Sequence, residues 1–168
     1  MHMLISAGSL ADDSSCLKLA RKAADHVPEH VDTTFIDPHD LEIQFCDARS
    51  WDEYNEDTTE WQQAVDRADR YLFAVPVYNW SYSGVFKNMV DLVPPDSWEG
   101  TTGFMAKGNN NRGYLMLQRE LRSLMAYFGV TTVPETVYAT DKDFTDGDLA
   151  SQDIERRIER LVQALIDA

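Results

Sequence analysis

Short apolar runs alternate along the chain with stretches in which apolar residues recur every three or four positions. Segments of a length typical of strands cover residues 3–7, 31–36, 71–75 and 103–106, and residues 131–138 contain a fifth strand that is interrupted or started at Pro134. Helical spacing is found over residues 14–27, 58–68, 83–93, 112–128 and 149–166. Strands that alternate with helices in this way predict an α/β fold, with a parallel sheet and helices on both of its faces.

The predicted strands differ in how they are expected to be buried. Residues 71–75 are continuously apolar, as in a strand that is covered on both faces. Residues 31–36 are polar at alternate positions, which is typical of an edge strand. Residues 37–57 are acidic and follow neither period, so we expect a loop there. The helix over residues 14–27 is expected to face inward through Leu17, Ala20, Ala24 and Val27.

The composition is that of a globular chain, and the charge narrows the classes of partner. Of the 168 residues, 43% are hydrophobic, so we expect residues 1–168 to bury a core as a single domain. With 15 basic and 29 acidic residues, the net charge is −14, which excludes binding to the phosphates of DNA or RNA. The same charge argues against an anionic membrane surface as a partner.

The sequence favours a cytoplasmic protein. The longest apolar run, residues 71–77, is too short to span a bilayer. Residues 1–7 lack the basic flank of a secretory signal. Cys16 and Cys46 are the only cysteines and form no CxxC pair, so neither a disulfide framework nor a metal site is expected.

Hydroxyl side chains gather between the first predicted strand and the first predicted helix. Gly8 permits a tight turn, and Ser9, Ser14 and Ser15 lie where the helical spacing begins. A helix N-terminus has free N–H groups and about half a positive charge, so this loop is suited to a phosphate. The alternative is ordinary capping, in which Asp13 or Ser14 only completes the helix end.

Aromatic side chains gather after the third predicted strand. Residues 76–84 contain Tyr78, Asn79, Trp80 and Tyr82. Aromatic side chains and exposed backbone amides suit a flat heteroaromatic ring with a polar edge. The alternative is that the three aromatic residues pack under the loop or fill a contact between subunits.

Two spaced motifs occupy these loops. The first is Gly8-Ser9, followed after four residues by Ser14. The second consists of Pro76, Tyr78, Asn79, Ser81, Gly84, Lys87, Asn88 and Asp91. Together they resemble the NADPH-dependent FMN reductase family, which includes quinone, azo-dye and chromate reductases of flavodoxin-like fold. The resemblance implies a three-layer sandwich with a five-stranded parallel sheet of order 2-1-3-4-5, in which both loops meet at one crevice.

The resemblance also implies which residues hold FMN. The phosphate would be bound by Ser9, Ser14, Ser15 and Cys16. The ring and ribityl chain would be held by Pro76, Val77, Tyr78 and Asn79, with Trp80 beside the ring. The loop after the fourth strand would close over the other side of the ring through Lys107, Gly108, Asn109 and Asn110. For that last loop, the composition alone favours the alternative of a plain flexible turn.

The implied function is that of an FMN-dependent NAD(P)H oxidoreductase of the flavin or quinone reductase type. Such an enzyme passes a hydride from nicotinamide to FMN and then to a small acceptor, with NADPH or NADH as the dissociable donor. Because the flavin carries the chemistry, no side chain is expected to act as a catalytic acid or base. Family members commonly form homodimers or homotetramers, and Trp80, Tyr82 and Trp98 are expected to be exposed near the subunit boundary.

Two positions depart from the family pattern. Ala11 stands where the family usually has arginine, and Val77 stands where it has glutamate. Both changes weaken the case for NADPH as the efficient donor. Two other functions stay open: a flavodoxin-like FMN electron carrier without NAD(P)H turnover, and a cofactor-free structural homologue.

Other polar residues are expected to be structural. Lys87, Asn88 and Asp91 are predicted to bond loop carbonyls at the start of their helix. The histidines fall outside both loops in the sequence and are predicted to lie on the surface; they are His2, His26, His30 and His39.

Overall fold

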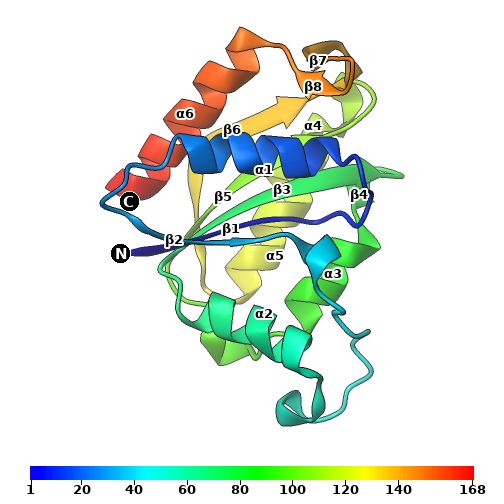
Figure 1. Ribbon diagram of the computed structural model, residues 1–168, viewed down its shortest axis with the longest axis vertical. Helices are drawn as coiled ribbons and strands as arrows, with labels where there is room; N and C mark the ends of the chain where they lie inside the picture. The colour runs from blue at the N-terminus through cyan, green and yellow to red at the C-terminus, as the bar shows by residue number, and fades with distance from the viewer.

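The computed structural model describes residues 1–168, and its main sheet contains five parallel strands in the order β2-β1-β3-β5-β6 (Figure 1). Their bounds are His2–Ala7 (β1), Asp32–Ile36 (β2), Arg70–Tyr78 (β3), Thr101–Lys107 (β5) and Thr131–Ala139 (β6). This is the order 2-1-3-4-5 predicted for the parallel strands, and β2 lies at the edge as expected. Two short antiparallel pairings were not predicted: β4 (Ser81–Tyr82) pairs with the end of β3, and β7 (Phe144–Thr145) pairs with β8 (Asp148–Leu149).

Helices cover both faces of the sheet, as predicted (Figure 1). One face carries α1 (Ser15–Asp25) and α6 (Gln152–Asp167), and the other carries α2 (Glu56–Asp66), α3 (Gly84–Asp91), α4 (Tyr114–Met116) and α5 (Arg122–Tyr127). The helix predicted over residues 112–128 is divided, because a π-helical turn, Leu117–Leu121, separates α4 from α5. No helix of the chain has both the length and the apolar character needed to cross a membrane.

The two faces of the sheet bury different side chains. The face under α2, α3 and α5 is rich in aromatic residues, and Phe73 lies at its centre in contact with Trp61, Tyr71 and Phe86. Trp98, predicted to be exposed at a subunit boundary, is 3% exposed and packs in this aromatic core. That prediction was wrong because Trp98 is close in sequence to turn-forming prolines, and the chain folds it back onto the sheet.

The inward face of α1 is rotated from the predicted one. The buried residues are Cys16, Leu19, Ala20 and Ala23, whereas Leu17, Ala24 and Val27 lie at the margin of the core. The apolar stripe on this helix is wider than one row of side chains, and the middle of the stripe faces the sheet. Ser14 precedes the helix as its N-cap rather than forming its first turn.

The connection between β2 and α2 is irregular, as predicted, but it is tied to α3. The Asn88 side chain donates to the Gln44 carbonyl oxygen at 2.9 Å and accepts from the Cys46 amide at 2.8 Å. The structural role expected of Asn88 is therefore confirmed. Lys87 and Asp91 pair with each other at 2.6 Å instead of bonding loop carbonyls, so for these two the predicted partners were wrong.

Candidate functional site

The two loops with unusual residues meet at the carboxyl ends of β1, β3 and β5. Two adjoining pockets, of about 170 and 130 Å³, lie there and share Val77 and Asn109. The first is lined by Ser9, Ala11, Asp13, Ser14, Ser15, Cys16, Pro76, Val77, Tyr78, Lys107 and Asn109. The second is lined by Val77, Asn79, Trp80, Gly108, Asn109, Asn110, Gly113 and Tyr138. Every residue that the sequence suggested for a cofactor site thus lines this crevice, as the convergence of strand ends requires.

At one end of the crevice, α1 presents unpaired main-chain amides. The Ser14 hydroxyl accepts from the Leu17 amide at 3.3 Å and so caps the helix. The amides of Ser15 and Cys16 donate to no group of the protein. Capping and ligand binding are therefore compatible here, because the cap uses a lone pair of Ser14 and leaves its O–H and the next two amides available.

Buried neighbours fix the loop between β1 and α1. The Gly8 amide donates to the Ala74 carbonyl at 2.8 Å, and the Ser83 hydroxyl donates to the Gly8 carbonyl at 2.5 Å. Ser83 also caps α3 by accepting from the Phe86 amide at 3.0 Å. A side chain at Gly8 would bring its Cβ within 2.7 Å of the Phe86 Cβ, so only glycine fits. Sequence reasoning missed Ser83, although a serine before a helical period is a capping signal.

The carboxylates of this loop have side-chain partners. Asp13 pairs with Lys18, and this hydrogen bond raises the pKa of the lysine. The Asp12 carboxylate lies 2.9 Å from His39 Nε2. His39 is exposed, as predicted, and although it lies outside both loops in the sequence, the fold brings it beside the first one. The pairing with Lys18 reduces the negative charge that Asp13 presents to an anion.

Cys16 takes part in the crevice only through its main chain. The residue is 2% exposed, its side chain packs into the core with α6, and burial raises the pKa of the thiol to about 12. The sulfur therefore stays protonated near neutral pH. A phosphate at this end would meet the Cys16 amide and not the thiol.

At the other end of the crevice, a tight hairpin replaces much of the predicted loop. Strand β3 runs on to Tyr78, and Asn79 and Trp80 form a two-residue turn with φ of 50° and 69° before β4. Such a left-handed pair matches the twist of the strands, but it is costly for tryptophan. Tyr78 and Trp80 project into solvent, with 54% and 58% of their surface exposed. Tyr82 is half-buried against Phe86, so for this residue the packing alternative is the correct one.

The loop after β5 is pinned by a tyrosine from β6. The Tyr138 hydroxyl donates to the Asn110 carbonyl at 2.7 Å, and a Cβ at Gly108 or Gly113 would collide with that hydroxyl. The loop is thus anchored to β6 through Asn110. Lys107, at its start, pairs with Asp141. Sequence reasoning gave Tyr138 no role, because no local pattern shows that a strand end will reach across to this loop.

Comparisons with known proteins show the family of the chain. The model of the NADPH-dependent FMN reductase family matches residues 1–145. An NAD(P)H-dependent FAD/FMN reductase from Geobacillus thermodenitrificans is 28% identical over 170 residues, which cover 99% of this chain and 92% of that protein. An NADH-dependent FMN reductase from Pseudomonas fluorescens is 37% identical over 97 residues, or 57% of this chain and 52% of that protein.

Solved structures support the fold. An oxidoreductase from Corynebacterium diphtheriae superposes with a TM-score of 0.82 at 23% identity, covering 99% of this chain and 97% of that one. A flavodoxin-like protein from Agrobacterium tumefaciens superposes with a TM-score of 0.68 at 16% identity, covering 99% and 97%. With most of its length matched by the family model and its sheet in the flavodoxin order, the chain belongs to the NADPH-dependent FMN reductase family.

Proposed function

We propose that the chain is an FMN-dependent NAD(P)H oxidoreductase that delivers reducing equivalents to a small acceptor such as a quinone or free flavin. The observation that carries this proposal is the crevice itself. It brings the residues of both motifs together and ends in the unpaired amides of Ser15 and Cys16. The relatives named above are reductases of the same kind.

The residues present fit FMN. Its phosphate would be held by the amides of Ser15 and Cys16 and by the hydroxyls of Ser9 and Ser14. A helix N-terminus binds a phosphate without any lysine or arginine, so the net charge of −14 is no obstacle. The ring and ribityl chain would lie along residues 76–80, with residues 107–110 on the opposite side.

The chain's own residues position and shield reactants. When bound, FMN supplies the redox chemistry that the side chains lack. We infer that the protein contributes no acid or base, because Asp13 is paired with Lys18, Lys107 is paired with Asp141, and the Cys16 thiol is protonated. The main-chain amides of Asn109 and Asn110 donate to no group of the protein and would supply fixed donors to the polar edge of the ring.

Two measurements on the purified protein test this function. Titration with FMN, followed by quenching of flavin fluorescence, is expected to give a micromolar or tighter Kd. Under anaerobic conditions, NADH or NADPH is then expected to bleach the bound flavin, and added quinone to restore its colour. Absence of FMN binding would identify a cofactor-free homologue, and binding without bleaching by either nucleotide would identify an electron carrier.

We further propose that the protein is a homodimer or homotetramer of single-domain, cytoplasmic subunits. Exposed apolar side chains such as Phe45 and Tyr127, each 78% exposed, support association. The unpaired cysteines Cys16 and Cys46 support a reducing compartment. Light scattering decides the oligomeric state, cell fractionation decides the location, and a single unfolding transition is expected for one domain.

A further inference from the structure

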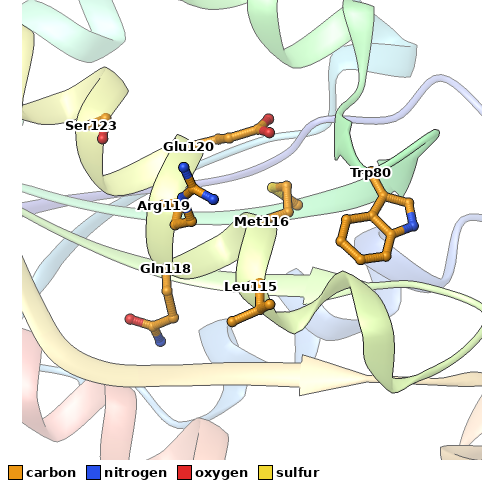
Figure 2. Close-up of a pocket in the computed structure, with 7 residues that line it drawn as sticks. All are labelled: Trp80, Leu115, Met116, Gln118, Arg119, Glu120 and Ser123. Carbon is orange, nitrogen blue, oxygen red and sulfur yellow. The ribbon is translucent and has the colours of Figure 1, made fainter.

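A second, larger hollow adjoins the crevice across the β3–β4 hairpin. This groove has a volume of about 640 Å³ and runs along α4 and the π-helical turn toward α5 (Figure 2). Its lining residues are Trp80, Leu115, Met116, Gln118, Arg119, Glu120 and Ser123. Trp80 also lines the second crevice pocket, so this residue borders both spaces. The groove is of the size that small-molecule ligands occupy.

The groove contains one cation, and that cation is unpaired. No carboxylate oxygen lies within 4.0 Å of the Arg119 guanidinium, and the side chain donates to no other group of the protein. By contrast, Lys18 and Lys107 near the crevice are both held by aspartates. Arg119 is exposed, and its planar set of donors matches a phosphate. In a chain of net charge −14, it is the one cation in the groove lining that can attract an anion to this place.

The other walls of the groove suit a flat, partly apolar ligand. The Trp80 indole is 58% exposed and stands at one end, and the exposed Leu115 side chain lies near it (Figure 2). Glu120 is the only carboxylate in the lining, and it accepts from the Ser81 hydroxyl at 2.6 Å, on the hairpin. An aromatic plane followed by a guanidinium is the combination that recognises a purine base joined to a phosphate.

We propose that this groove binds the adenine-nucleotide end of the NAD(P)H donor, with Trp80 against the base and Arg119 on a phosphate. The inference rests on the proposed function, because a dinucleotide whose nicotinamide enters the crevice must place its other half outside. The β1–α1 loop offers that half no cation, since residues 8–16 contain Ala11 and two aspartates but neither lysine nor arginine. The groove, which begins at Trp80, contains one.

The test compares Arg119→Gln with the matched control Arg160→Gln. Arg160 is also exposed and unpaired, but it lies on α6, which covers the opposite face of the sheet. In Arg119→Gln, the KM for the NAD(P)H donor is expected to rise about ten-fold, while kcat and the Kd for FMN stay unchanged. Arg160→Gln is expected to leave all three constants at their wild-type values.

Two donors and two fragments identify which phosphate Arg119 binds. A rise in KM for NADPH alone, with weaker calorimetric binding of adenosine 2′,5′-bisphosphate, identifies the ribose 2′-phosphate. A rise for NADH as well, with weaker binding of ADP, identifies the pyrophosphate. Glu120→Gln removes the only negative charge of the groove and is expected to tighten fragment binding about two-fold.

Two results would overturn the inference. One is an active wild-type enzyme in which Arg119→Gln changes neither KM nor the binding of either fragment. The other is a change of oligomeric state in Arg119→Gln, measured by light scattering, with unaltered fragment binding, which would make the groove a contact between copies. Failure of the wild type to bind FMN counts against the proposed function instead, and fragment binding still reports on the groove directly.

Discussion

At the α1 end of the crevice the groups open to a ligand are main-chain amides fixed by buried neighbours, whereas at the hairpin end they are side chains that project into solvent. Ser9 and Ser14 are each 6% exposed, but Tyr78 and Trp80 are more than half exposed. Two hydrogen bonds hold the α1 end in place: the cap that Ser14 makes on α1 and the bond from the Ser83 hydroxyl to the Gly8 carbonyl. The hairpin end contains two left-handed residues that are not glycine.

The difference separates two tasks. A rigid pocket of amides suits a constant group such as a phosphate, which differs little from one ligand to another. Exposed aromatic side chains suit ligands that bind and dissociate, because these side chains offer contact area and can be substituted without disturbing the core. The α1 end should therefore resist substitution, and the hairpin end should tolerate it.

Gly8→Ala is expected to have the largest effect. Its new Cβ would lie 2.7 Å from the Phe86 Cβ, inside the core, so the free energy of unfolding should fall by about 2–3 kcal/mol in urea denaturation. Gly84→Ala is the control, since a Cβ there meets no atom within 4 Å and should be neutral or slightly stabilising. Equal stability of the two variants would show that the α1 end is not rigid.

Gly108→Ala tests the β5 loop, which lines the crevice beside the hairpin but is held by Tyr138. Its Cβ would collide with the Tyr138 hydroxyl, which is the end of a side chain rather than a core atom. We expect FMN affinity to fall about ten-fold, a loss of about 1.4 kcal/mol, and the double variant with Tyr138→Phe to recover part of it. No recovery in the double variant would show that the loss does not come from the clash with the Tyr138 hydroxyl.

Ser14→Ala separates the capping role from the ligand role. Loss of the bond to the Leu17 amide should lower the free energy of unfolding by about 1 kcal/mol. Ser151→Ala is a matched control, because Ser151 caps α6 by accepting from the Ile154 amide at 3.4 Å, far from the crevice. Both variants should lose similar stability, but only Ser14→Ala should bind FMN more weakly in the fluorescence titration.

Trp80→Gly is expected to have the smallest effect on stability. Unlike Gly8→Ala and Ser14→Ala, it is expected to raise the free energy of unfolding. Relief of a left-handed tryptophan contributes about 1–2 kcal/mol, and the greater freedom of glycine in the unfolded chain offsets about 0.4–1 kcal/mol. The net gain should be about 0.5 kcal/mol in thermal unfolding, with a higher KM for the donor. Asn79→Gly should gain less, because asparagine tolerates this conformation. A less stable Trp80→Gly would show that indole packing outweighs the strain.

The elements were predictable because each is long enough to show its own period. The continuous apolar run of β3 and the helical spacing of α6 both identify their segments without outside information. The hairpin was missed because two-residue turns of this type usually contain glycine, and Asn79-Trp80 does not look like one. Trp98 was misplaced because its burial depends on Tyr71 and Phe128, which are remote in sequence.

The candidate site was predictable where the residues lie next to the turns that present them. Ser9, Ser14, Tyr78 and Asn109 fall in strand-to-helix loops, and loops of this kind converge in a parallel sheet. The supports from elsewhere were not predictable. Ser83 and Tyr138 act through single hydrogen bonds to carbonyl groups of the loops they hold, and no periodicity or composition encodes such a pairing.

The tie between Asn88 and the β2–α2 connection also affects how such chains are grouped. Asn88 belongs to the motif that follows Tyr78, yet its partners are Gln44 and Cys46 in an acidic surface segment and not the crevice. One residue of the second motif therefore anchors the long connection between β2 and α2. A related chain that lacked the serines of the first loop but kept Asn88 would retain this fold without the proposed binding of FMN.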